Sequence, residues 1–294
     1  MAFPERFSNL PDYAFPRLRA LLDGHASGAD DPVEMTIGTP MHAYPHWIRD
    51  ILIDNIDGFR GYPPNDGTPG LLSSITGWIA RRYDAELDPA TRVMALNGTR
   101  EGLYNAAMAL GVEKKKGRTP VVLTPNPFYP AYAMAALSIG AHPIFVPATL
   151  ETGFLPDFET LDAEILNRTT LVYFCSPSNP QGAVAGWDYW TRLFALAETY
   201  DFKVFADECY SEIYRKTPPP GALEVAARKG IDPERVVAFH SLSKRSNLAG
   251  LRSGFVASGP ENIRRIKKQR AYSGCPLPLP IQKVSQKVWS DEDH

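Results

Sequence analysis

The chain has 294 residues, of which 44% are hydrophobic and 22% charged, and this balance excludes a mainly disordered protein. Its 31 Lys and Arg against 33 Asp and Glu give a net charge of −2, which argues against a general binder of nucleic acids or anionic membranes. No apolar run reaches the roughly 18–20 residues that span a bilayer, and the N-terminus lacks a secretory signal pattern. We therefore expect a cytoplasmic protein with no membrane or nucleic-acid partner.

The three cysteines also fit a reducing compartment, because an odd number at wide spacing predicts no disulfide framework. Neither they nor the six histidines show the spacing of a metal site, so no metal is expected.

In chain order, the first candidate element is an amphipathic helix at 15–22, followed by a polar loop. From there, short apolar runs typical of buried strands alternate with stretches whose apolar residues lie three and four apart. The expected strands are 94–96, 121–124, 144–146, 171–175, 203–206, 236–239 and 254–257. The expected helices are 72–83, 101–110, 131–139, 189–200, 261–272 and 282–289.

This alternation predicts an α/β fold with a mostly parallel sheet sandwiched by helices. Ligands of such sheets bind in the loops at the carboxyl ends of the strands. The residues directly after each apolar run are therefore the candidate site residues.

The first three of these loops give modest signals. Gly98 and Thr99 form a turn that opens a helix, where backbone N–H groups and a hydroxyl suit a phosphate, although this loop taken alone favours Thr99 as an ordinary helix cap. Tyr129 lies in a proline-bounded loop and can stack on a planar ring or pack in the core. Asn179 lies in a similar turn, as a ligand contact or as a common turn residue.

The last two loops carry stronger chemistry. Asp207 directly follows an apolar strand, with Tyr210 three residues on, although Asp207 also suits a helix cap. Lys244 stands among small hydroxyl residues after another strand, where a desolvated amine can act as a nucleophile, and Arg252 offers a fork for a phosphate. Together these residues provide a lysine for an aldehyde, a carboxylate for a ring nitrogen, phosphate donors and an aromatic ring, which is what pyridoxal 5'-phosphate (PLP) requires.

From about residue 35 to the end, the sequence resembles the fold-type I PLP-dependent aminotransferases of class I/II. The motifs that carry the resemblance are Gly61-Tyr-Pro-Pro, Asn97-Gly-Thr-Arg, Pro127-Phe-Tyr-Pro, Ser176-Pro-Ser-Asn-Pro-Gln-Gly, Asp207-Glu-Cys-Tyr-Ser-Glu-Ile-Tyr and Ser241-Leu-Ser-Lys-Arg-Ser-Asn-Leu-Ala-Gly-Leu-Arg-Ser-Gly-Phe. The last two strings, together with Arg270-Ala-Tyr-Ser-Gly-Cys, are most similar to bacterial N-succinyldiaminopimelate aminotransferases.

The resemblance implies a role for each matching residue. Lys244 would be the catalytic residue, bonded to the cofactor aldehyde and later moving the substrate Cα proton. Asp207 would keep the pyridine nitrogen protonated, and Gly38 would lie beside the substrate carboxylate. The other implied cofactor-binding residues are Gly98, Thr99, Arg100, Tyr129, Asn179, Tyr210, Ser241, Ser243 and Arg252, with Tyr62 reaching the phosphate in the partner subunit of a homodimer.

The implied reaction is transamination of N-succinyl-LL-2,6-diaminopimelate with 2-oxoglutarate, in lysine biosynthesis. Alternatives are another amino-acid aminotransferase, a PLP lyase of the same fold, and an inactive PLP-binding chain. The implied domains are an N-terminal arm with part of a small domain (1–45), a PLP-binding large domain (46–280) and the start of an interdomain helix (281–294).

Relatives of the implied family continue for roughly 100 more residues, a domain's length. We therefore expect an incomplete small domain, weak or absent transamination, and an apolar surface left exposed near Trp289. The family's carboxylate-binding arginine would lie in that further part, and Arg49, Arg60 and Arg270 match it only loosely.

Overall fold

The seven apolar runs form one seven-stranded sheet in the computed structural model, which describes residues 5–8 and 13–294. The strands are β1 (Val93–Leu96), β2 (Val121–Asn126), β3 (His142–Pro147), β4 (Thr169–Cys175), β5 (Lys203–Asp207), β6 (Val236–Ser241) and β7 (Gly254–Ser258). Their order across the sheet is β1-β7-β6-β5-β4-β2-β3, and only β7 runs antiparallel to its neighbours. The prediction of a mostly parallel sheet is confirmed.

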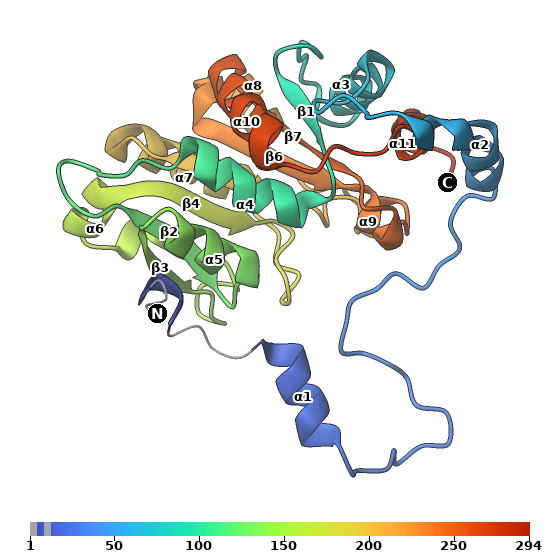
Figure 1. Cartoon of the computed structure of the whole chain (residues 1–294). Helices are drawn as coiled ribbons and strands as arrows, with labels where there is room; N and C mark the ends of the chain where they lie inside the picture. The colour runs from blue at the N-terminus through green and yellow to red at the C-terminus, as the bar shows by residue number, and fades with distance from the viewer. Residues whose placement is uncertain (1–4, 9–12) are drawn as a thin grey trace. The chain divides into compact units, whose positions relative to one another are not determined.

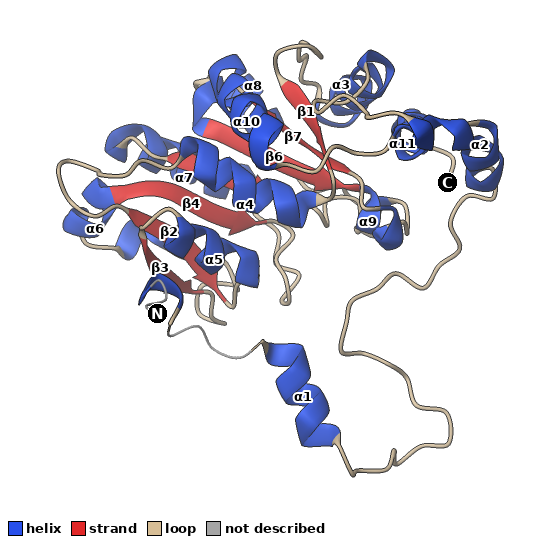
Figure 2. Cartoon of the chain, viewed as in Figure 1, coloured by secondary structure: helices blue, strands red, loops and turns tan. Residues whose placement is uncertain are grey.

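Helices cover both faces of this sheet (Figure 1; Figure 2). One apolar layer lies between the sheet and α4 (Thr99–Leu110), α5 (Pro130–Ser138) and α10 (Pro260–Ser273). The opposite layer lies under α3 (Pro69–Tyr83), α7 (Trp187–Tyr200), α8 (Ala222–Lys229) and α11 (Leu279–Ser290). All the strands except the partly exposed edge strand β3 are therefore buried on both sides. This is why they read as unbroken apolar runs rather than as alternating ones.

The remaining elements are short. They are η1 (Glu5–Phe7), α1 (Ala14–Leu22), α2 (Ile48–Asp54), η2 (Ile56–Arg60), η3 (Phe158–Thr160), α6 (Ala163–Arg168), η4 (Pro233–Arg235), α9 (Leu242–Arg245) and η5 (Ala249–Leu251). In the described part of the chain, no helix combines the length and apolar character that crossing a membrane requires.

The chain divides into two units, Met1–Thr39 and Pro40–His294. The first unit contains α1, which has no buried residue. The second contains the whole sheet, and residues 281–294 belong to it as well. The finer division at residues 45 and 280 stays a prediction.

The expectation of an exposed apolar surface near Trp289 is wrong. Trp289 is 1% exposed and packs its ring against Trp78 of α3 at 4.8 Å and Phe255 of β7 at 5.0 Å between ring centroids. Val284 and Val288, on the same side of α11, are also fully buried. The helix is amphipathic, and its apolar side finds cover on α3 within the same unit.

Parallel strands bring their carboxyl ends to one edge. β5 and β6 pair in register from Val204 with Val236 to Asp207 with Phe239. Because β7 is antiparallel to β6, its first residue, Gly254, pairs with Ser241 at the same edge. The residues just before β7 therefore join those that follow the parallel strands.

Replacing Trp289 tests the packing of α11. We expect Trp289→Ala to lower the free energy of unfolding by about 3–5 kcal/mol, because a large buried side chain leaves a cavity. Urea denaturation measures this change. The control is Tyr272→Ala, at a side chain that is 89% exposed, which should change stability by about 0.5 kcal/mol or less. Similar small effects for both variants would contradict the packing.

Candidate active site

The turn between β1 and α4 has the geometry of an anion site. Gly98 has φ +84°, a conformation that favours glycine, and it precedes the N-terminus of α4. A Cβ at Gly98 would lie 2.3 Å from Nη2 of Arg252, so the guanidinium lies directly against this turn. Backbone N–H groups and a guanidinium at a helix N-terminus suit a phosphate.

Hydroxyl groups border the same place. A Cβ at Gly254 would lie 3.4 Å from the Thr99 side chain and 3.5 Å from the Cα of Ser241, which shows how closely these two strand ends approach. Ser241 caps the short helix α9: its Oγ accepts a hydrogen bond from Ser243 N at 3.0 Å. Ser241 Oγ also lies 2.8 Å from Ser243 Oγ. The structure thus brings Arg252, Thr99, Ser241 and Ser243 together around one turn.

Lys244 lies on α9, directly after Ser243. Its Nζ lies 5.8 Å from the centroid of the Tyr210 ring, and partial burial lowers the pKa of the amine below its usual value. An ammonium that loses part of its hydration gives up its proton more easily, so the environment shifts the amine toward its neutral, nucleophilic form.

Tyr210 has a second neighbour, which contacts its hydroxyl group. Asn179, in the loop after β4, donates from Nδ2 to the Tyr210 hydroxyl at 3.2 Å. Burial raises the pKa of Tyr210, so its phenol keeps its proton and stays a donor. Two of the predicted cofactor-binding residues, Asn179 and Tyr210, therefore meet in the structure.

Asp207 ends β5 as a buried carboxyl group. It is 5% exposed, and burial raises its pKa, while a hydrogen bond from the Tyr132 hydroxyl, 2.6 Å from Oδ2, acts in the opposite direction. A buried carboxylate is stabilised by a cation or a donor placed against it. A protonated ring nitrogen is such a group, so the site fits one.

Tyr132 is a functional candidate that sequence reasoning missed. It is fully buried on α5, and its ring stacks on Tyr173 at 4.5 Å between centroids. The only sequence signal was its position in the first turn of the helix that follows the Tyr129 loop. It was not recognised, since contact with Asp207, 75 residues away in sequence, needs the fold.

Arg100 and Tyr129 are paired with each other. Arg100 Nε donates to the Tyr129 hydroxyl at 2.5 Å, and its guanidinium carbon lies 5.7 Å from the centroid of that ring. Tyr129 in turn lies edge-to-face on Tyr132 at 5.7 Å. The predicted aromatic is thus anchored between a surface arginine and the residue that contacts Asp207.

Two further residues complete the predicted set. Tyr62 is fully exposed, at 102% of its reference surface. Gly38 belongs to the N-terminal unit. Their roles stay predictions.

Among the arginines considered for a substrate carboxylate, Arg270 is already engaged. It is 1% exposed and donates from Nε and Nη2 to the two Glu101 oxygens at 2.6 and 3.1 Å. Arg49 and Arg60 are exposed. Across residues 5–8 and 13–294, no three His, Cys, Asp or Glu side chains are placed to hold a metal ion.

Comparison with known proteins gives a consistent family. The family model described as aminotransferase class I and II matches residues 31–294. An LL-diaminopimelate aminotransferase of Desulforudis audaxviator is 35% identical over 278 residues, which cover 91% of this chain and 68% of that protein. One of Dehalococcoides mccartyi is 30% identical over 288 residues, covering 96% and 71%.

Solved structures agree. An aminotransferase from Neisseria meningitidis superposes with a TM-score of 0.92 at 35% identity, covering 99% of this chain and 74% of that one. The aminotransferase AspB from Helicobacter pylori gives 0.86 at 34% identity, with the same coverage. The curated relatives carry the name LL-diaminopimelate aminotransferase, so they do not support the narrower resemblance to enzymes of the N-succinylated compound.

The hydrogen bond from Tyr132 to Asp207 can be tested without any ligand. Tyr132→Phe should raise the pKa of Asp207 further, because it removes a donor that lowers it. Since a raised folded-state pKa removes stability as pH increases through it, the variant should lose about 1–3 kcal/mol at neutral pH and less as Asp207 protonates. Denaturation at several pH values, with a carboxyl-carbon NMR titration, measures both.

The matched control is Tyr104→Phe, which removes a hydroxyl that donates to Ser138 Oγ at 2.8 Å, away from Asp207. It should leave the titration of Asp207 unchanged. An unchanged titration in Tyr132→Phe would contradict the assignment.

Proposed function

Because the chain belongs to the aminotransferase class I and II family, whose members use PLP, we propose that it transfers an amino group from LL-diaminopimelate to 2-oxoglutarate. The observation that carries the proposal is the pairing of two neighbouring strand ends: β5 ends in the buried Asp207, and β6 leads into the partly buried Lys244. A buried acid and a lysine of lowered pKa at adjoining strand ends suit a ring nitrogen that must stay protonated and an aldehyde that needs an amine.

The donor set of the site fits PLP. The Gly98 turn, where a Cβ would meet the Arg252 guanidinium, and the Thr99 and Ser241 hydroxyls suit a phosphate with two negative charges. Asp207 suits the ring nitrogen, and Tyr129 supplies a ring for stacking. In this proposal, Asn179 and Tyr210 donate to the hydroxyl oxygen of the cofactor ring.

When bound, PLP supplies an aldehyde carbon that takes the amino group and a ring that accepts electrons. The chain's own contribution is to place proton donors and acceptors. Asp207, held by Tyr132, keeps a proton at the ring nitrogen. Lys244 Nζ, in its neutral form, would accept the proton from the substrate Cα. It would then deliver that proton to the cofactor carbon that carries the transferred amino group.

The identity of the donor rests on the relatives. The curated proteins act on LL-diaminopimelate by their names, whereas the motifs around Lys244 and Arg270 resemble enzymes of its N-succinylated derivative. The two donors differ by one acyl group on the distal nitrogen. At that nitrogen the free compound presents a cation, whereas the derivative carries a succinyl group that ends in a carboxylate. Comparing turnover with the two donors therefore distinguishes the two proposed substrates.

The proposal includes a homodimer in which Tyr62 reaches the partner's cofactor phosphate. Its complete exposure supports this, because a large aromatic ring in water is available for contact with a second copy.

The lysine is tested by absorbance. PLP added to the purified protein should give a visible band that sodium borohydride fixes onto the chain, and Lys244→Ala should abolish this fixation. Lys283→Ala, at an exposed position of α11, is the control and should behave as the parent. Peptide mapping that finds the reduced adduct at another lysine would overturn the assignment.

The donor is tested by following glutamate formed from 2-oxoglutarate. We expect LL-diaminopimelate to support turnover with a kcat/KM at least tenfold above that of its N-succinyl derivative, a difference of about 1.4 kcal/mol. The reverse preference would restore the succinylated donor, and keto acid released without glutamate would indicate a lyase.

A further inference from the structure

The segment from Glu208 to Gly221 carries Tyr210 and joins β5 to α8. Its two ends are tied by one side chain, since Glu208 Oε1 accepts a hydrogen bond from Ala222 N at 2.6 Å. Between these ends the tip is open to water, with Ile213 and Tyr214 57% and 46% exposed. The position of Tyr210 therefore depends on polar contacts to the body of the protein rather than on burial of the tip.

Glu208 is a rigid anchor for the start of this segment. It is 2% exposed, and Oε2 accepts a hydrogen bond from the Tyr83 hydroxyl at 3.2 Å. Burial and the Glu208 charge raise the pKa of Tyr83 well above its usual value, so that phenol remains a donor. A Cβ at Gly221 would lie 2.4 Å from the Tyr83 ring and 2.9 Å from Glu208 Oε2, so only glycine lets the two ends approach so closely.

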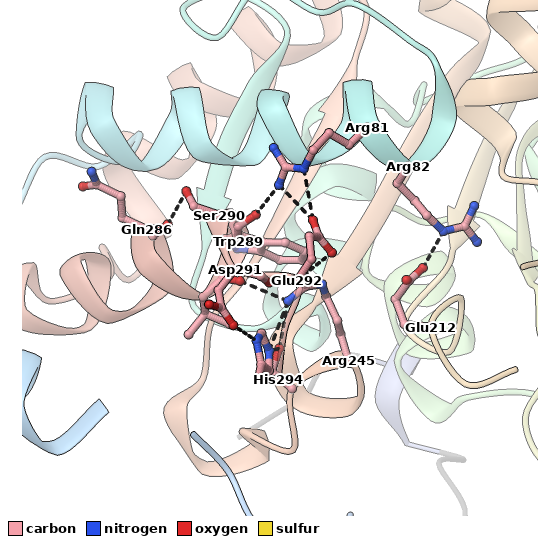
Figure 3. Close-up of polar contacts among 12 residues, drawn as sticks. Arg81, Arg82, Glu212, Arg245, Gln286, Trp289, Ser290, Asp291, Glu292 and His294 are labelled. Carbon is pink, nitrogen blue, oxygen red and sulfur yellow. Dashed lines mark hydrogen bonds and ion pairs between the residues drawn. The ribbon is translucent and has the colours of Figure 1, made fainter. Parts of the chain in front are cut away.

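Arg82, beside Tyr83 at the end of α3, holds the middle of the segment. Its Nε donates to Glu212 Oε1 at 2.8 Å (Figure 3), and Nη2 donates to the carbonyls of Pro219 at 3.0 Å and Ser211 at 3.5 Å. The Arg82 side chain is 11% exposed and that of Glu212 18%. One guanidinium therefore joins the first and last parts of the segment, at a place partly shielded from water.

We propose that Arg82 is a positioning residue: by holding Ser211, Glu212 and Pro219, it fixes the segment so that the Tyr210 hydroxyl stays next to Asn179 and its ring next to Lys244. Arg82 touches none of the reacting groups. Its effect on the site passes through Tyr210, which lies one residue before Ser211, and the inference therefore rests on the proposed role of Tyr210.

Figure 3 also provides a matched control. Arg81, the preceding residue of α3, donates to Glu292 Oε1 at 2.9 Å and to the Trp289 carbonyl at 3.0 Å, and neither bond involves the 208–221 segment. Arg81→Met and Arg82→Met thus remove the same group from adjacent positions of one helix. Only the second is expected to affect Tyr210.

The first measurement uses the protein without cofactor. In Arg82→Met, amide hydrogen exchange of residues 209–217 should accelerate at least tenfold, about 1.4 kcal/mol in local opening, while the sheet is unaffected. Glu212→Gln, which removes the charge from the other side, should act in the same direction, and Arg81→Met should not. Unchanged exchange at 209–217 in Arg82→Met would overturn the proposal.

The second measurement separates positioning from a merely structural role. In the PLP-loaded protein, Arg82→Met should move the pH midpoint of the visible absorbance upward, because a displaced Tyr210 no longer donates to the ring hydroxyl oxygen. Tyr210→Phe should move it in the same direction. Faster exchange with an unchanged midpoint would overturn the positioning role. A parent protein with no visible band would refute the proposed function instead, while the exchange measurement would still decide whether Arg82 holds the segment.

Discussion

Asp207 is an acid kept almost out of water at the end of β5, and the arrangement of the site follows from the need to stabilise it. Burial raises its pKa, and the Tyr132 hydroxyl offsets part of that effect. Tyr132 is in turn fixed by stacking on Tyr173 of β4 and by the edge of Tyr129. The group that anchors the candidate cofactor site is thus supported by a column of aromatic rings on one face of the sheet.

The next residue works on the opposite face. Because side chains alternate along a strand, Glu208 points into the layer under α3 and α8, where it meets Tyr83 and the first N–H of α8. The adjacent acids Asp207 and Glu208 therefore make their contacts on opposite faces of the sheet. Asp207 belongs to the chemistry at the sheet edge, and Glu208 ties that edge to the helices and anchors the segment that carries Tyr210.

The neighbour of Lys244 has a comparable structural role. The Arg245 guanidinium lies near the rings of both Trp78 and Trp289, 5.7 and 5.2 Å from their centroids. It donates to the carbonyls of Val288 and Asp291, each at 3.1 Å. Figure 3 shows Arg245 beside Trp289 and Asp291. The four-residue helix α9 is too short to be stable alone. Packing of Arg245 against α3 and α11 therefore helps to hold it.

Every strand predicted from the sequence is present. Buried strands can be recognised because they appear in the sequence as short runs of apolar residues. The same pattern placed Lys244, Asp207, Asn179 and Thr99 after strand ends, and parallel topology alone brings such positions to one edge. The prediction failed where partners are distant in sequence. Trp289 was expected to be exposed, since nothing local shows that α3 covers it. The short helices α2, α6, α8 and α9 were not predicted.

By itself, the sequence determined the α/β class, the order of the elements and the chemical types available at the sheet edge, because these depend on local periodicity and on residue identity. Only the tertiary structure decided which polar groups share a hydrogen bond: Tyr132 with Asp207, Tyr83 with Glu208, and Arg82 with Glu212. Each of these bonds joins residues from different elements, so its geometry depends on how the helices pack on the sheet, which no local pattern records.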